Sequence, residues 1–351
     1  MKLSIPSQFH ATFFATIIML PVLFCLSCNT TKEEDKRNND TNSFKNIYQF
    51  KELNTATINS LDKSKTVIII PGGIMEEHGP YLPSFTDGYW NEKFTDTLSK
   101  TIAKRKDWNV VIFPSIPLGN SGANDVGLKY SFAGTYTVRF ETLRSVFMDL
   151  ATELGEQGFK YIFIVHGHGA PNHQRALDQA SDFFNETYKG KMVNLMGLNP
   201  IITNWFEAAK TPEQQKEDGF TIHAGLAETS SMLFLQPQLV NKGYKTSQSF
   251  TASNMENLVT IAKSPQWQGY FGAERLASAQ FGEKAWNENV TMFTKYALDI
   301  LDNKINLDTV KRFGNYMKES KMDVMLDSLS LKEEQGRTEK QLMWLKGKGL
   351  K

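Results

Sequence analysis

The chain has 351 residues, of which 40% are hydrophobic, 12% aromatic and 22% charged. This is the composition of a globular protein with ample material for a core, which excludes wholesale disorder and fibrous architectures. The 39 basic and 38 acidic side chains give a formal net charge of +1, so no basic surplus indicates a nucleic-acid partner. The two cysteines, Cys25 and Cys28, lie in the first thirty residues. Any metal in the folded body must therefore be bound by His, Asp and Glu side chains.

The first 28 residues have the layout of a secretory signal peptide. An almost wholly apolar run extends from Ala11 to Ser27, is short for a membrane span and contains Pro21. The triplet ending at Cys28 is similar to a bacterial lipoprotein processing site, so we expect lipidation of Cys28. A retained single-span anchor is the alternative. We thus expect an exported lipoprotein on the periplasmic or cell-surface face, in contact with the membrane only through its N-terminal lipid.

The order of the following segments predicts an α/β fold. Residues 29–49 predict a disordered tether, because residues 29–43 contain no apolar side chain. Residues 50–298 predict the folded domain. Its four apolar runs are typical of buried parallel strands: Thr66–Ile70, Asn109–Phe113, Tyr161–Val165 and Met192–Met196. Its notable stretches with helical periodicity are Trp90–Lys104, Val138–Leu154 and Gln174–Tyr188. Their alternation predicts a layered α/β/α domain with a mostly parallel central sheet.

Residues 299–351 predict a helical C-terminal extension. Apolar residues recur there at helical spacing, at Leu307, Val310, Phe313 and Met317. We expect one or two helices that pack on the domain or on a neighbouring subunit and supply no obvious chemistry.

Five of the six histidines fall in three short segments. His78 follows the first predicted strand, and His166, His168 and His173 follow the third, whereas His223 lies further along the chain. Because ligands of open α/β sheets bind beyond the carboxyl ends of the strands, the first two segments should converge there.

This convergence predicts a metal site. Glu76 and His78 are two residues apart, which in an extended backbone places both side chains on one face, and Asp87 follows a glycine- and proline-rich turn. With His168 they bring two carboxylates and two imidazoles together, an arrangement that is costly without a cation. Such nitrogen and oxygen ligands suit Zn, Mn or Fe. A separation above about 10 Å between the His168 imidazole and the Asp87 carboxylate would contradict the prediction, since paired ions lie about 4 Å apart.

The third segment, His223 to Ser231, adds a further imidazole and the carboxylate of Glu228. A structural role, with Glu228 at a helix start and His223 half-buried, is the alternative for either residue alone. We expect Ser230 and Ser231 to cap a helix rather than to act as nucleophiles.

These residues together resemble the creatininase family of metal-dependent amidohydrolases. The matching segments are Glu76-Glu77-His78-Gly79-Pro80-Tyr81-Leu82-Pro83 with Thr86-Asp87, His166-Gly167-His168-Gly169-Ala170, Phe132-Ala133-Gly134-Thr135, and His223-Ala224-Gly225-Leu226-Ala227-Glu228-Thr229-Ser230. The resemblance covers residues 65–235, about half of the chain.

The resemblance implies a centre with two divalent metal ions bridged by Asp87. Glu76 and His168 would complete one site, and His78 would bind in the other. The family has a glutamate two residues after the loop histidine, where this chain has Ala170. We expect Glu228 to replace it as a metal ligand or to carry protons, and His223 to act beside the substrate as hydrogen-bond donor or proton shuttle. The family also forms rings of subunits, so we expect a homo-oligomer.

The expected reaction is hydrolysis of a C–N bond in a small cyclic amide or formamide by a metal-bound hydroxide. The substrate-contacting segments differ from the family. Tyr81 replaces a histidine of many relatives, His166 replaces an asparagine, and the loop that contains Ser121 lacks a Glu-His pair. Tyr81, Ser121 and Trp205 are candidate substrate contacts.

Two other functions remain open. A non-catalytic lipoprotein that binds a metal or ligand on the same scaffold would explain Ala170 and the altered loop, although the full ligand set argues against it. A metal-dependent phosphoesterase would use the same ligands on another substrate.

Overall fold

The computed structural model describes residues 44–202, 208–316 and 321–350, all within the unit Phe44–Lys351. The predicted signal peptide, most of the tether and Trp205 lie outside the described residues. A five-stranded sheet in the order β1-β3-β2-β4-β5 runs through this unit, and every neighbouring pair of strands is parallel. The strands are β1 (Ile47–Gln49), β2 (Thr66–Pro71), β3 (Asn109–Ile112), β4 (Tyr161–Val165) and β5 (Lys191–Asn194).

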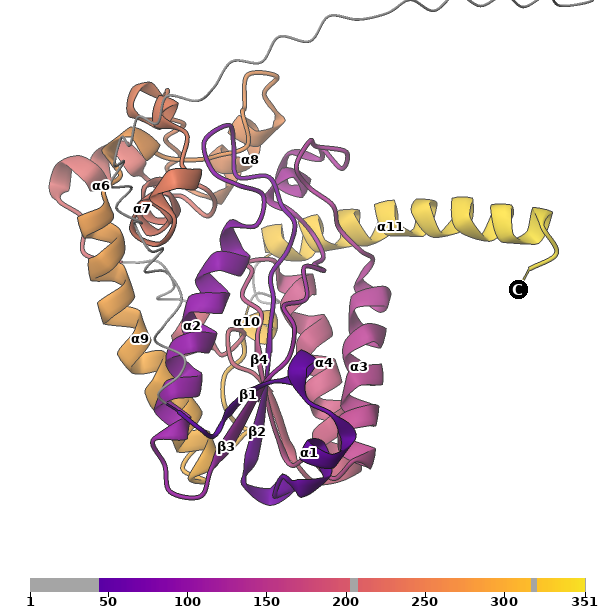
Figure 1. Cartoon of the computed structure of the whole chain (residues 1–351). Coiled ribbons are helices and arrows are strands. Elements are labelled where there is room, and N and C mark those ends of the chain that lie inside the picture. The colour runs from indigo at the N-terminus through magenta and orange to yellow at the C-terminus, as the bar shows by residue number, and fades with distance from the viewer. Residues whose placement is uncertain (1–43, 203–207, 317–320, 351) are drawn as a thin grey trace, which may run out of the picture. The chain divides into compact units, whose positions relative to one another are not determined.

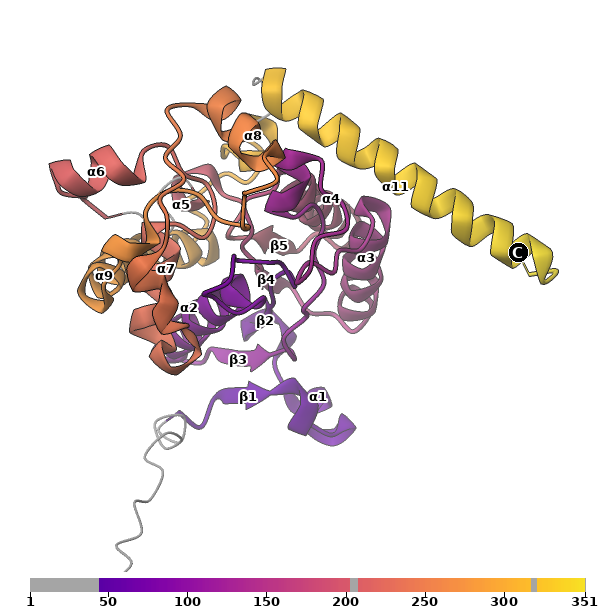
Figure 2. The same cartoon turned by 90° about the horizontal axis from the view of Figure 1, so that it is seen from above.

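Helices occupy both faces of the sheet (Figures 1 and 2). The helices of the described residues are α1 (Thr55–Ser60), α2 (Thr86–Ala103), α3 (Phe140–Glu156), α4 (Pro171–Tyr188), α5 (Asn199–Ile202), α6 (Pro212–Asp218), α7 (Leu226–Leu235), α8 (Met255–Lys263), α9 (Ala279–Leu301), α10 (Phe313–Tyr316) and α11 (Lys321–Gly347). Of these, α2 and α9 cover one face of the sheet and α3 and α4 the other. The layered α/β/α fold predicted from the alternating pattern is confirmed.

The alternation of side chains along β2 creates a hydrophobic core on each face of the sheet. Val67 and Ile69 pack with α2 and α9 in one core, whereas Ile68 and Ile70 pack with α3 and α4 in the other. All four side chains are fully buried. Successive strand residues point to opposite faces, so a strand covered on both sides must be apolar throughout, as this one is.

A third apolar cluster lies beyond the carboxyl ends of the strands. It is formed by α7, α8 and the irregular segments around them, with Met232, Leu258 and Phe271 among its buried members. Together with the loops that follow β2 and β4, these segments surround the region where the sequence predicts the site.

Two boundaries differ from the sequence prediction. The sequence pattern predicts that residues 44–49 belong to the tether, but Ile47–Gln49 form the edge strand β1 and pair with Val110 to Ile112 of β3. The helix predicted from Leu307 onwards is wrong over its first turns, where the chain forms turns before the short helix α10. Leu307 and Val310 still pack against the first core. The Asn306 side chain accepts a hydrogen bond of 2.9 Å from Asp308 N, which stabilises a turn here in place of the first helical turns.

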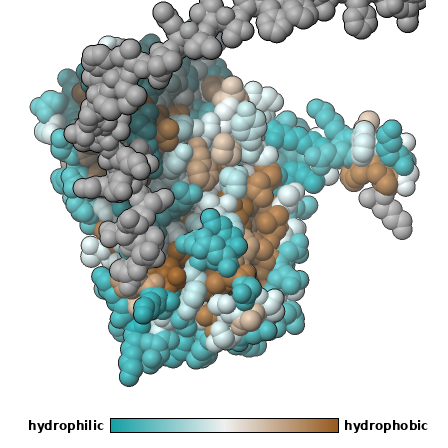
Figure 3. Space-filling model, viewed as in Figure 1, coloured by the Kyte–Doolittle hydropathy of each residue, from teal (hydrophilic) through white to brown (hydrophobic). Residues whose placement is uncertain are grey.

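The last helix, α11, extends from the body of the described unit towards the C-terminus (Figure 2). Its first turns contact α4 and the segment Ala123–Gly127. Its far end carries a hydrophobic group, visible in Figure 3, in which Leu342, Met343 and Trp344 are 55%, 73% and 60% exposed. Within the described ranges, no helix combines the length and apolar character that a bilayer crossing requires.

Candidate metal centre

The three histidine segments converge at the carboxyl edge of the sheet, as predicted. Glu76 and His78 lie in the loop after β2, and His168 lies in the loop after β4. Asp87 is the second residue of α2, and Glu228 is in the first turn of α7. The His168 ring lies 3.0 Å from the Asp87 carboxylate, far inside the separation that would have contradicted the prediction.

One group of candidate ligands consists of Glu76, Asp87 and His168. The His168 Nδ1 atom is 3.2 Å from Glu76 Oε2 and 3.0 Å from Asp87 Oδ2. Exposure is 0% for Glu76, 3% for Asp87 and 6% for His168. The group thus offers two carboxylate oxygens and one imidazole nitrogen in a space nearly closed to water.

A second group, formed by His78, Asp87 and Glu228, shares Asp87 with the first. The His78 Nε2 atom is 3.5 Å from Asp87 Oδ1 and 3.6 Å from Glu228 Oε2. The two oxygens of Asp87 therefore face different groups, Oδ2 towards His168 and Oδ1 towards His78. This is the arrangement that a carboxylate bridging two ions requires.

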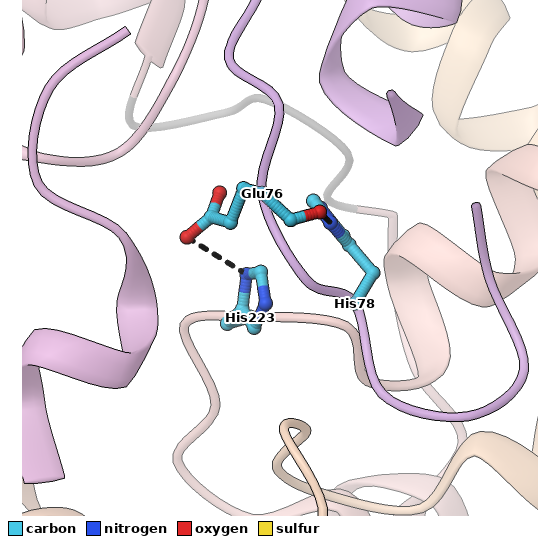
Figure 4. A group of neighbouring side chains, drawn as sticks. All are labelled: Glu76, His78 and His223. Carbon is cyan, nitrogen blue, oxygen red and sulfur yellow. Dashed lines mark hydrogen bonds and ion pairs between the residues drawn. The ribbon is translucent and has the colours of Figure 1, made fainter. Parts of the chain in front are cut away.

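His223 completes a third overlapping group with Glu76 and His78. Its Nδ1 atom is 3.9 Å from Glu76 Oε1, and its ring centroid is 4.3 Å from that of His78. Figure 4 shows the three side chains directed towards one another from two separate loops.

Each of the three imidazoles is oriented by a backbone carbonyl. His78 Nδ1 lies 3.1 Å from the Glu76 carbonyl, His168 Nε2 lies 2.6 Å from that of Ser121, and His223 Nε2 lies 2.6 Å from that of Glu77. Since a carbonyl can only accept, the facing ring nitrogen donates, and the opposite nitrogen of each ring faces the carboxylates. Such outer contacts fix the tautomer of a metal-binding histidine.

The charges of the site depend on one another. Burial raises the pKa of Glu76 and Asp87, but the adjacent imidazoles outweigh burial and leave both pKa values below their usual range. Conversely, burial lowers the pKa of the three imidazoles, but the carboxylates outweigh it: the pKa of His78 is raised, that of His168 lies well above its usual range, and that of His223 rises to about 10. The cluster of carboxylates therefore requires nearby positive charge, which a divalent cation would supply.

The geometry of unpaired atoms also fits a metal. Among the described residues, the buried atoms Glu76 Oε2 and His78 Nε2 have no hydrogen-bond partner. Four ligands about 2.05 Å from a tetrahedral zinc ion lie about 3.3 Å from one another. The separations of 3.0 to 3.6 Å between the candidate ligand atoms match that spacing. The nitrogen and oxygen donors suit Zn, Mn or Fe.

Two of the carboxylates lie at helix N-termini. Asp87 is in the first turn of α2, and Glu228 is in the first turn of α7, where Glu228 Oε2 accepts a hydrogen bond of 2.6 Å from Ala224 N. The positive end of a helix dipole favours a negative side chain there. The structure thus places Glu228 beside His78, although the predicted metal and proton roles of Glu228 stay predictions.

Two of the three candidate substrate contacts, Ser121 and Tyr81, lie among the described residues. The Ser121 hydroxyl donates to Asn120 Oδ1, so its carbonyl rather than its hydroxyl is the group directed at the site. Tyr81 is half-buried and packs against Tyr270, with ring centroids 5.9 Å apart. Trp205 lies outside the described residues.

The predicted capping role of Ser230 and Ser231 is wrong. Both residues lie inside α7, whose N-cap is Gly225. Ser230 Oγ accepts from Ser278 N, and Ser231 Oγ donates to the Ala227 carbonyl. Ser230 thus contacts the N-cap residue of α9, whereas the hydrogen bond of Ser231 stays within α7.

Two residues near the site were not singled out from the sequence. Glu77 is 3% exposed, accepts from Gly79 N and lies 3.6 Å from His223 Nε2. Asn91 of α2 donates to the carbonyls of Gly72 and Gly167, at 2.7 and 3.1 Å, and so joins the loops after β2 and β4. Glu77 stands within the predicted motif, but no spacing rule indicates the role of Asn91.

Comparison with known proteins points to the same family that the sequence motifs resemble. The family model described as creatininase, creatinine amidohydrolase, matches residues 51–296. A mycofactocin precursor peptide peptidase of Mycobacterium ulcerans (strain Agy99) is 26% identical over 196 residues, which are 54% of this chain and 66% of that protein. The creatinine amidohydrolase of Pseudomonas putida is 22% identical over 182 residues, which are 50% of this chain and 66% of that protein. In both cases the chain covers slightly less than two thirds of the relative.

Solved structures agree at the level of the fold. A creatinine amidohydrolase (creatininase) structure superposes with a TM-score of 0.52 at 18% identity, over 71% of this chain and 95% of that chain. A structure described as creatininase Mn gives a TM-score of 0.54 at 18% identity, over 73% and 99%. The fold and the buried site define an α/β protein with a cluster of carboxylates and imidazoles suited to a divalent metal. More specifically, the chain belongs to the creatininase family.

Proposed function

We propose that this protein is a metal-dependent amidohydrolase that cleaves a C–N bond of a small cyclic amide or formamide. The main support is the buried cluster in which Asp87 offers one oxygen to each of two ligand groups. Glu76 and His168 would bind one ion together with Asp87, and His78 and Glu228 would bind the second. A bound ion polarises a substrate carbonyl and lowers the pKa of water towards neutrality.

His223 is the candidate for proton transfer. The Glu77 carbonyl accepts from its Nε2 at 2.6 Å and holds the ring, so Nδ1 faces the site. A departing amide nitrogen needs a proton, and the doubly protonated imidazolium form of His223, held in this way, would donate one to it from Nδ1. Glu228, whose side chain is 13% exposed, is the second group able to hold a proton at the edge of the site.

The burial of the cluster favours a small substrate. Glu76, His78, Asp87, His168 and His223 are each at most 6% exposed. A peptide amide is the second candidate, because a curated relative at 26% identity is described as a mycofactocin precursor peptide peptidase. In both candidates the bond to be cleaved is an amide C–N bond, and the same metal-ligand residues would serve its hydrolysis.

The decisive experiment compares metal content and turnover of the wild type with those of Asp87→Ala. We expect one to two equivalents of Zn, Mn or Fe in the wild type and loss of both metal and turnover in the variant. Asp96→Ala, on the exposed side of the same helix, is the matched control. His223→Gln should keep its metal and lose turnover about 100-fold or more, the usual contribution of a general acid.

The substrate panel contains formamides, lactams, cyclic ureas and short peptides beside phosphate esters. Hydrolysis of only the phosphate esters would replace the amidohydrolase proposal with a phosphoesterase. Metal binding without turnover of any of them would favour the non-catalytic lipoprotein.

We also propose that the protein is a lipoprotein anchored through Cys28 and that it forms a homo-oligomer. The signal-like composition of residues 1–28 supports the anchor. The exposed apolar turn at Leu342 to Trp344 supports a subunit contact. Cys28→Ser should move the protein from the membrane fraction to the soluble fraction, and light scattering on the purified chain should give a multiple of the monomer mass.

A further inference from the structure

The C-terminal helix α11 reaches the segment between β3 and α3 that borders the metal centre. Ser330 Oγ donates to Asp125 Oδ2 at 3.0 Å, and Arg337 donates to the Tyr130 carbonyl at 2.8 Å. These contacts join residues about 200 positions apart. The helix lies beyond the residues that the family model matches, which end at 296.

Glu334 contacts Asn120, the residue directly before Ser121 in the chain. Its Oε1 accepts a hydrogen bond of 2.5 Å from Asn120 Nδ2, and its Oε2 accepts one of 2.9 Å from Phe140 N, in the first turn of α3. The Glu334 carboxylate therefore contacts both ends of residues 120–140, the part of the β3–α3 connection that leads into α3. Charged acceptors make the stronger class of hydrogen bond.

Asn120 is held on its other side by a pair of buried histidines. Asn120 N donates to His173 Nδ1 at 3.2 Å, so His173 Nε2 carries the proton and donates to His166 Nδ1 at 3.1 Å. His166 Nε2 in turn donates to the Ile116 carbonyl at 2.9 Å. This chain of hydrogen bonds has a single direction, because a backbone amide donates at one end and a carbonyl accepts at the other.

The segment fixed at Asn120 contacts two candidate metal ligands directly. The next carbonyl, that of Ser121, accepts from His168 Nε2 at 2.6 Å, and Ala123 N donates to Glu76 Oε1 at 2.5 Å. Ser121 has a φ of 58°, a conformation that a residue with a side chain rarely adopts unless its surroundings enforce it. The hydrogen bonds of Asn120 to Glu334 and to His173 hold the backbone next to Ser121 and so stabilise this conformation.

We infer that Glu334 is a positioning residue for the metal centre, acting through Asn120 on the Ser121 carbonyl and the Ala123 amide, and thereby on His168 and Glu76. The inference rests on the proposed metal function. It assigns to the C-terminal helix a role in the site that the pattern of the sequence does not indicate.

The test uses the metal-free full chain and three variants: Glu334→Ala, Glu334→Gln, and the control Glu339→Gln on an exposed position of the same helix. Hydrogen exchange is measured at the amides of Asn120 and Ala123, and Zn²⁺ affinity is measured against a competing chelator. Thermal unfolding of each variant checks that the fold persists. Glu334→Gln conserves shape and one acceptor oxygen, so it remains informative if Glu334→Ala is unstable.

We expect Glu334→Ala to raise exchange at both amides and to weaken Zn²⁺ binding about tenfold, the lower end for groups that orient metal ligands. Glu334→Gln should give an intermediate effect, and Glu339→Gln should match the wild type. A lower unfolding temperature with unchanged exchange and Zn²⁺ affinity would show a merely structural role and overturn the inference. Faster exchange with unchanged Zn²⁺ affinity would also overturn it. A wild type that binds no Zn²⁺, Mn²⁺ or Fe²⁺ would contradict the proposed function instead, and the exchange at Ala123 would still test the positioning.

Discussion

Replacing Glu274 by glutamine should stabilise the protein at alkaline pH. Glu274 is fully buried, and within the part of the chain that the structure describes neither of its carboxyl oxygens has a hydrogen-bond partner. Burial raises the pKa of Glu274 to about 9, against the smaller opposing effects of Ser247 and His223. The folded protein therefore keeps this carboxyl protonated at a pH where the unfolded chain ionises it.

The sign and size of the effect follow from that difference. Between the usual pKa of 4.5 and about 9, the folded state binds more protons than the unfolded state, so the free energy of unfolding falls as the pH rises. The loss is about 1.4 kcal/mol for each pH unit, or about 4 kcal/mol between pH 5 and pH 8. A neutral amide of nearly the same shape does not titrate and removes this loss.

The assay is urea unfolding of wild type and Glu274→Gln at pH 5 and pH 8. The two proteins should agree within about 1 kcal/mol at pH 5, and the variant should be more stable by about 4 kcal/mol at pH 8. Glu283→Gln, on an exposed position of α9, controls for the loss of a carboxylate as such. Equal pH dependence in the wild type and Glu274→Gln would refute the reasoning.

Three further outcomes can be measured independently. Gly72→Ala should lower stability by about 1–3 kcal/mol in urea unfolding, because the new Cβ would lie 2.3 Å from His166 Cδ2; wild-type stability would contradict the close packing. Phe94→Ala should cost about 3–5 kcal/mol, since Phe94 is 1% exposed and packs 4.7 Å from the Trp286 ring; a loss below 1 kcal/mol would contradict this. Chelation of metal should lower the unfolding temperature of the wild type but not of Asp87→Ala, and equal shifts in both would argue against a metal bound at Asp87.

The main strands were predictable because a strand that is buried on both faces is apolar at nearly every position, and such a run is easy to recognise in the sequence. Ile68 and Ile69 point to opposite cores, so the run is apolar at every position. The edge strand β1 is different. It has only three residues, all half-buried, and it follows a polar segment, so neither length nor apolar content separates it from the tether.

The convergence of the candidate metal ligands was predictable from strand order and residue type. The contacts that position the loops carrying these ligands were not. Asp87 and His168 follow strand ends, and parallel strands bring those ends to one edge. Glu334 reaches Asn120 across 214 positions and belongs to no motif. Such a pairing depends on where a distant helix packs, which residue spacing does not specify.

The boundaries of the family match do not coincide with those of the folded unit. A chain trimmed to residues 51–296 would lose the edge strand β1 and would end inside α9, before the buried side chains of Ile300 and Leu301. It would also lack Glu334. Recombinant work on this protein should therefore keep the chain from Phe44 to the end of α11. A shorter product would lack the core side chains of Ile300 and Leu301 and the Glu334 carboxylate that contacts Asn120.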